Sequence, residues 1–186
     1  MIRIMSVNFI SYLAAHAEDT LSLEPLKPLF CAGDPVVSLF IVISGEVALE
    51  RLSEAGTRLI IQRAKAGDLL AEASAFAAHY HCYAHALRTS IAKRLSMRRF
   101  QAICIQDPTL LTAMAHHLAV QLQAARMQTE ILSLRVVAMR LDAWLVANNG
   151  TLPPRGEWRD LADMLAVTPE ALYRELAGRR RMAITW

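Results

Sequence analysis

Three histidines stand at alternate positions in one short segment, at His79, His81 and, beyond Tyr83, His85. Alternate side chains of a β-strand share a face, so the three imidazoles could hold a metal ion or a haem. Polar side chains on the solvent-facing side of a strand or loop give the same pattern, and we prefer this simpler interpretation. Direct contact with a small ligand is the third interpretation.

Three cysteines, Cys31, Cys82 and Cys104, are scattered along the chain. This odd number matches neither a disulfide framework nor a four-cysteine zinc or iron-sulfur set, and it is typical of a reducing compartment. We therefore expect a cytoplasmic protein. The apolar stretch from Ile4 to Leu13, followed by Ala15-His16-Ala17, imitates a secretory signal. Polar residues interrupt this stretch, so we expect a short amphipathic helix instead.

Two residues suited to reading DNA lie on one predicted helix near the end of the chain. Thr168 is a favourable N-cap, Pro169 suits the first helical position, and Glu170 suits the positive helix end. Arg174 falls one turn further along the same face. Arginine can pair with guanine through two hydrogen bonds, and glutamate can accept one from cytosine.

A second short helix is expected just before this one, from Trp158 to Leu165, with Ala166-Val167 in the turn. The two helices would form a helix-turn-helix in which Leu172 and Leu176 face inward and Tyr173 faces outward. Any helical hairpin with a capped second helix shares this spacing. The pattern is therefore consistent with DNA binding without requiring it.

Three arginines, Arg179, Arg180 and Arg181, follow Gly178. Because glycine commonly ends helices, we expect the helix to stop there and the arginines beyond it to meet DNA phosphates. The alternative is a solvated helix end. The predicted DNA-binding residues are Thr168, Pro169, Glu170, Tyr173, Arg174, Arg179, Arg180 and Arg181.

Between Leu26 and about Leu95 the sequence favours an antiparallel sheet. Short apolar runs alternate with turn pairs about ten to twelve residues apart, which is typical of a small barrel or roll. One such turn is expected at Ser44-Gly45-Glu46, and a helical period begins after Ser96-Met97. The predicted strands include Leu39–Ile43, Val47–Leu49 and Leu59–Ile61.

A long helix is expected after Asp107-Pro108, because neither glycine nor proline occurs again before Gly150. Its apolar positions alternate steps of four and three residues, a period of about 3.5 that is typical of a coiled coil. A parallel homodimer is the expected arrangement, and a helix packed on its own sheet is the alternative. A further helix is expected from near Leu134 to Asn148. The seam residues are Leu111, Ala115, Leu118, Leu122, Ala125, Thr129, Leu132 and Val136.

The composition limits the class of protein. The chain has 186 residues, of which 54% are apolar and 20% charged, which is enough to bury the core of one large or two small domains. A formal net charge of +3 permits nucleic acid as a partner without requiring it. No apolar stretch approaches the roughly 18 to 20 residues of a membrane span, so we expect no membrane partner.

The order of these segments resembles the Crp/Fnr family of bacterial transcription regulators. The likeness covers roughly residues 24–176, and the motifs that carry it are Gly33-Asp34, Phe40 to Val47, Ala66 to Glu72, Arg99-Phe100 and Asp107-Pro108. The resemblance implies an α+β fold with a cyclic-nucleotide-binding-like antiparallel β-roll sensor at 1–106, a dimerisation helix at 107–133 and a winged helix-turn-helix DNA-binding domain at 134–186. It implies a homodimer that binds double-stranded DNA, with RNA polymerase as a further partner.

The resemblance also locates an effector pocket, where this chain departs from the family. Members that bind cyclic nucleotides have Gly-Glu and then Arg-Ser or Arg-Thr, whereas this chain has Ala71-Glu72 and Cys82-Tyr83. Glu72 keeps an acceptor for a ribose hydroxyl, but Cys82 supplies no cation for a phosphate. The family's seam helix offers hydroxyls to adenine, and here Ala125-Arg126 stand in that place. The pocket candidates are Glu72, Cys82, Tyr83 and Arg126, and we expect an effector other than cyclic AMP.

Other cofactors and classes of protein fit this sequence less well. An iron-sulfur cluster of the family's type needs four cysteines, and the haem ligands of its carbon monoxide sensor would fall on Ala71 and Ala73. A cupin-type metalloenzyme also uses His-x-His, but it would not explain the seam helix or the tail, so we expect no enzyme. Only ten residues follow Leu176, too few for a full wing. A protein-interaction dimer without specific DNA binding is therefore one alternative function, and a haem- or metal-based gas or redox sensor that uses the segment from His79 to His85 is the other.

Overall fold

The computed structural model describes residues 2–54, 56 and 58–183, with side chains described between residues 9 and 180. The chain divides into two compact units, residues 1–118 and 119–186. Each unit has its own core of buried apolar side chains. In the described part of the chain, no helix is both long enough and apolar enough to cross a bilayer. The predicted α+β class is confirmed.

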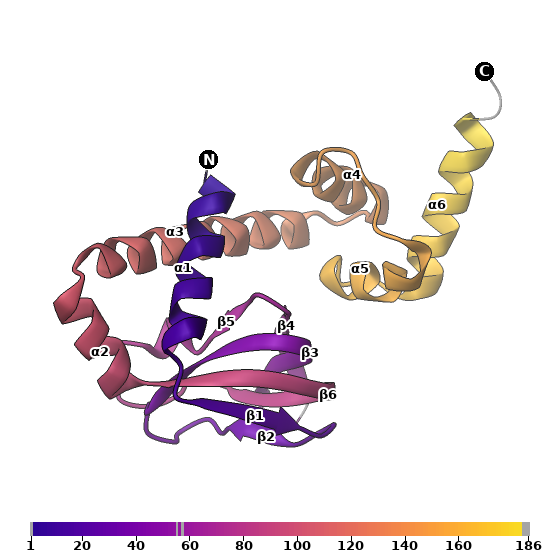
Figure 1. Ribbon diagram of the computed structural model, residues 1–186. Coiled ribbons are helices and arrows are strands. Elements are labelled where there is room, and N and C mark those ends of the chain that lie inside the picture. Colours follow the sequence, from indigo (N-terminus) through magenta and orange to yellow (C-terminus); the bar gives the residue numbers. More distant parts are fainter. Residues whose placement is uncertain (1, 55, 57, 184–186) are drawn as a thin grey trace. The chain divides into compact units, whose positions relative to one another are not determined.

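The first unit contains one antiparallel sheet, whose two longest strands, β3 and β6, run side by side (Figure 1). The strands are β1 (Asp19–Leu23), β2 (Pro28–Phe30), β3 (Ser38–Leu52), β4 (Arg58–Lys65), β5 (Leu69–Leu70) and β6 (Tyr83–Ser96). The main path is β1-β6-β3-β4, while β2 pairs with β6 and β5 pairs with β3. This arrangement is the expected β-roll.

The predicted turn at Ser44-Gly45-Glu46 is not a chain reversal. The two strands expected on either side of it form one continuous strand, β3, with irregular pairing to β6 at this point. Gly45 has a φ of +85°, and a Cβ atom there would lie 2.6 Å from the Cα of Ser90. Glycine is therefore required by a bulge against β6, which accounts for the turn-like sequence.

Helices cover the sheet of the first unit. They are α1 (Ile2–His16), α2 (Met97–Gln106) and the beginning of α3 (Thr109–Ser133). Ser96 caps α2 by accepting a hydrogen bond from the amide of Arg99 at 3.1 Å, and Asp107 accepts one from the amide of Thr109 at 3.0 Å. Phe9, Phe100 and Met114, one from each helix, are buried against the strands. The predicted change from sheet to helix at Ser96-Met97 is confirmed.

The second unit is helical. After the rest of α3 it contains α4 (Val137–Ala147), the 3₁₀ turn η2 (Arg155–Glu157), α5 (Trp158–Met164) and α6 (Pro169–Ala183). Its core includes Leu141 and Trp144 of α4, Leu161 of α5 and Leu172 of α6. The break that was expected after α4 occurs at Asn149 and Gly150, which both have positive φ.

Candidate nucleic-acid interface and effector pocket

Helices α5 and α6 form the predicted helix-turn-helix. The hydroxyl of Thr168 accepts a hydrogen bond from the amide of Ala171 at 3.2 Å, and Pro169 is the first residue of α6. In the turn, Ala166 adopts a φ of +48°, and the amide of Val167 donates to the carbonyl of Ala162 at 3.0 Å. The turn is therefore closed by backbone hydrogen bonds, and the two helices hold one another through buried leucines.

One face of α6 is exposed and chemically suited to base edges. Glu170, Tyr173 and Arg174 are exposed, whereas Leu172 and Leu176 are buried against the rest of the unit. Within the range that the structure describes, Arg174 has no carboxylate partner. Its donors are therefore available to a guanine, as the sequence predicts.

The predicted helix stop at Gly178 is wrong, because α6 continues to Ala183. Arg179 therefore lies on the helix, where its guanidinium donates to Glu175 at 2.8 Å, to Asp142 of α4 at 2.5 Å and to the carbonyl of Ala138 at 3.1 Å. Hydrogen bonding to Asp142 raises the pKa of Arg179. These contacts offset the cost of about 1 kcal/mol for glycine inside a helix.

The other two arginines of the triplet are Arg180 and Arg181. The guanidinium of Arg180 lies 5.4 Å from the centre of the Trp158 ring. The side chain of Arg181 lies outside the described residues. Arg179 is thus held by α4, whereas Arg180 lies against an aromatic ring.

The histidine segment does not form the single face that an extended strand would give. Strand β6 begins only at Tyr83, so His79 and His81 lie before it. A ring nitrogen of His81 shares a hydrogen bond of 2.8 Å with Ser74, while His85 lies 3.5 Å from the carboxylate of Glu50. Among the described residues, no group of three or more histidine, cysteine or acidic side chains is arranged to hold a metal ion.

Among the residues expected to line the effector pocket, Glu72 is a buried acid. Glu72 is 6% exposed, and its Oε2 atom has no hydrogen-bond partner in the described structure. Burial raises the pKa of Glu72 to about 7, and the charge of Asp68 contributes in the same direction. Ala71, the preceding residue, has a φ of +68°, a conformation that favours glycine, the residue that the family resemblance expects at this position. A buried carboxyl group that is neutral part of the time can therefore donate as well as accept a hydrogen bond.

Cys82 and an arginine that we did not predict lie beside this acid. The pKa of the Cys82 thiol is raised, mainly by burial. The positive charge of Arg51 acts against this rise, and the negative charge of Glu72 adds to it. Arg51 is exposed and donates to the carbonyl of His81 at 3.3 Å. Glu50 pairs with Tyr83 in the sheet, and this register places Arg51 next to Cys82. A correct prediction of the register would therefore have identified Arg51 as a neighbour of Cys82. Arg126 is exposed on the part of α3 that belongs to the second unit.

The predicted seam lies on α3 except for Val136, because α3 ends at Ser133, and it is largely uncovered in the single chain. Leu122 is 52% exposed, and Leu111 and Leu132 are exposed as well, whereas Leu118 packs on the core of the first unit. The one hydroxyl on the seam, that of Thr129, donates to the carbonyl of Ala125 at 2.9 Å. The polar group is thus satisfied within the helix, and the seam presents an apolar surface.

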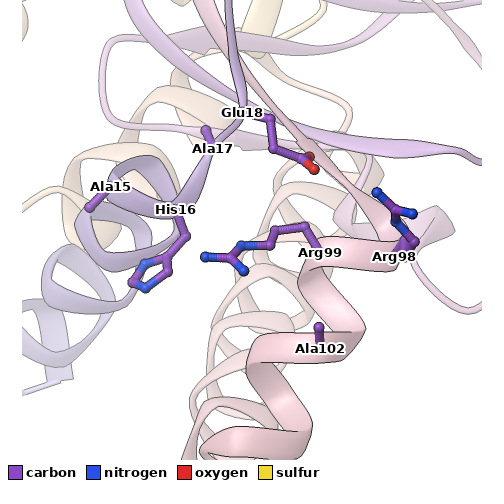
Figure 2. Close-up of a pocket in the computed structure, with 7 residues that line it drawn as sticks. All are labelled: Ala15, His16, Ala17, Glu18, Arg98, Arg99 and Ala102. Carbon is purple, nitrogen blue, oxygen red and sulfur yellow. The ribbon is translucent and has the colours of Figure 1, made fainter.

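A hollow of about 610 Å³ lies where the end of α1 faces the start of α2. Figure 2 shows the guanidinium of Arg99 reaching toward the space beside His16, with Glu18 above it. Hydrogen bonds from Ser96 lower the pKa of Glu18, which is therefore ionised at neutral pH. We assign no function to this hollow.

Comparison with known proteins supports the family resemblance. Residues 20–107 match the family model of the cyclic nucleotide-binding domain. The chain is 26% identical over 149 residues to "Probable transcriptional regulator flp" of Lacticaseibacillus casei, covering 77% of this chain and 68% of that protein.

Solved structures of regulators have the same fold. FixK2 from Bradyrhizobium japonicum superposes with a TM-score of 0.70 at 18% identity, covering 89% of this chain and 86% of that one. The c-di-GMP responsive global regulator CLP from Xanthomonas campestris gives a TM-score of 0.65 at 19% identity, covering 95% and 92%. The chain thus has the fold of these two regulators. The match over residues 20–107 and the shared fold support the resemblance to the Crp/Fnr family.

Proposed function

We propose that this chain is a homodimeric DNA-binding regulator that responds to an effector other than cyclic AMP. The observation that carries the proposal is the outward face of α6, where Glu170 and Arg174 are exposed opposite the buried Leu172 and Leu176. A capped helix with such a face is what major-groove recognition requires. Its relative in Lacticaseibacillus casei is named a transcriptional regulator, which supports a regulatory role over a catalytic one.

The homodimer would form along the seam of α3. Leu122 and Leu132 leave much of their apolar surface in water in the single chain, at a cost of about 25 cal/mol for each Å². Burial against the same seam of a second copy would remove that cost. Two copies related by a two-fold axis would then read a palindromic site.

The effector would occupy the β-roll near Glu72. Cyclic AMP and cyclic GMP carry a phosphate, and the family's arginine for that phosphate is replaced by Cys82. Burying an anion without a charge partner is costly, so an effector that exchanges hydrogen bonds with the Glu72 carboxyl is favoured.

Selection of bound fragments from genomic DNA tests the proposal. A shared palindrome among the fragments is the expected result. The rival function, a protein-interaction dimer, predicts no shared sequence and only weak, salt-sensitive binding. The family resemblance also makes RNA polymerase a proposed partner, for which we assign no residue.

A further inference from the structure

Two arginines from separate segments meet at the same aromatic ring in the second unit. The guanidinium carbons of Arg155, in η2, and Arg180, in α6, each lie 5.4 Å from the centre of the Trp158 indole. The indole is fixed, since its Nε1–H donates to the carbonyl of Pro153 at 3.1 Å and the residue is buried. The ring therefore holds two cations at defined positions.

Among the described side chains, neither cation is neutralised by an acid. Across the residues that the structure describes, no carboxylate forms an ion pair with Arg155 or Arg180, in contrast to Arg179. Cation–π attraction to the ring holds each guanidinium in place. A guanidinium held against an aromatic face keeps its in-plane N–H donors free, and these donors match the oxygens of a phosphate. Two such groups at one ring make a site for an anion.

The two arginines border an open cavity of about 360 Å³ that Trp158, Tyr173 and Ala177 also line. Tyr173, Ala177 and Arg180 are spaced by four and three residues, so they share one stripe along α6. Tyr173 also belongs to the outward face with Arg174. The cavity therefore adjoins the surface that we propose reads bases.

We propose that Arg155 and Arg180, held against Trp158, bind backbone phosphates of the DNA strand that borders the recognition helix. The inference rests on the proposed function, because it takes α6 as the helix that enters the groove. A protein surface beside such a helix faces the sugar-phosphate backbone, whose contacts fix register and supply affinity for any sequence. The site replaces the phosphate contacts that the sequence predicted for Arg179.

The test uses the full-length chain and a duplex of arbitrary sequence. The Arg155→Gln/Arg180→Gln variant should bind more weakly than wild type at every sequence. Its slope of log affinity against log salt should be shallower by about 0.9 for each phosphate that the variant no longer neutralises, summed over both copies of a dimer. Arg98→Gln/Arg99→Gln, an equal loss of two charges on α2 of the first unit, should leave the slope unchanged. Arg155→Lys/Arg180→Lys retains the charges and should keep most of the slope.

Each outcome separates this inference from the proposed function. An unchanged slope in the double glutamine variant, with a palindrome still selected by wild type, overturns the phosphate site alone. A reduced slope without any selected palindrome supports the phosphate site and overturns the sequence-specific regulator. Absence of wild-type binding to any duplex at low salt overturns both. Circular dichroism and urea unfolding of each variant establish that it is folded.

Discussion

The guanidinium of Arg179 on α6 donates a hydrogen bond of 2.5 Å to the carboxylate of Asp142 on α4. The same side chain reaches the carbonyl of Ala138, also on α4, and Glu175 on its own helix. One arginine thus ties the recognition helix to the helix behind it. The direction of α6 within the second unit depends on this contact as well as on the buried leucines.

Replacing Arg179 should therefore weaken folding more than DNA binding. We expect Arg179→Gln to lower the free energy of unfolding by about 1–2 kcal/mol, because hydrogen bonds between charged groups disappear, although exposure of Asp142 reduces the effect. Urea unfolding measures the change, and Arg174→Gln, which removes an unpaired charge from the same helix, should leave stability nearly unchanged. Unaltered stability with a shallower salt slope would instead make Arg179 a phosphate contact.

Arg174 should read one base pair. Its exposed guanidinium can give two hydrogen bonds to a guanine, so Arg174→Ala should cost about 1 to 3 kcal/mol in binding to the selected site. The sequence preference should relax at a single base pair in each half-site. The affinities of wild type and Arg174→Ala for duplexes with each base pair of the site changed in turn measure this preference. An equal loss at all sequences would show that Arg174 contacts phosphate.

The dimer should depend on Leu122. Leu122→Asp places a carboxylate in an apolar seam, which is costly to bury, so monomers are expected in sedimentation velocity. Leu118→Asp should act in the same direction, but Leu118 also packs on the core of the first unit, so Leu122 is the cleaner test. Ala124→Asp, an exposed position on another face of α3, is the matched control. If Leu122→Asp formed a dimer as stable as that of the wild type, the interface would lie elsewhere.

Glu72 should make stability depend on pH near neutrality. Its pKa in the folded chain is about 7, against an ordinary value of 4.5, so the folded state binds the extra proton between these values. Stability should therefore fall as pH rises from about 4.5 to 7 and level off above, by about 3 kcal/mol in total. Glu72→Gln should remove this fall and raise stability at pH 8. Urea unfolding at several pH values measures these changes, with Glu24→Gln, a substitution at an exposed position, as the control. If Glu72→Gln and the wild type showed the same dependence of stability on pH, Glu72 would not be a buried, neutral acid.

Cyclic AMP and cyclic GMP should not bind at physiological concentrations, because Cys82 stands where the family's phosphate-binding arginine is expected. Calorimetry with the purified chain measures this directly. Micromolar affinity for either nucleotide would contradict the prediction. Arg51→Gln would then show whether the arginine beside Cys82 supplies the missing charge, since its removal should abolish such binding.

Local signals in the sequence predicted the elements that depend on near neighbours. The cap of α6 at Thr168 involves residues three positions apart, so the sequence alone predicted it. The change of period after Ser96-Met97 likewise predicted where α2 begins. The inward positions of Leu172 and Leu176 follow from the helical period. The family resemblance identified the fold because it rests on the order of such segments.

Tertiary contacts decided what the local signals left open or suggested wrongly. Gly178 has the residue type of a helix end, but the helix continues because Arg179 finds partners 37 and 41 residues away. Gly45 has the residue type of a turn, but it packs against Ser90 on the neighbouring strand. Only the strand register shows that Gly45 forms a bulge. The pairing of Arg155 and Arg180 at Trp158 likewise joins segments distant in sequence. Such contacts depend on how the whole chain packs, and no short window of sequence contains that information.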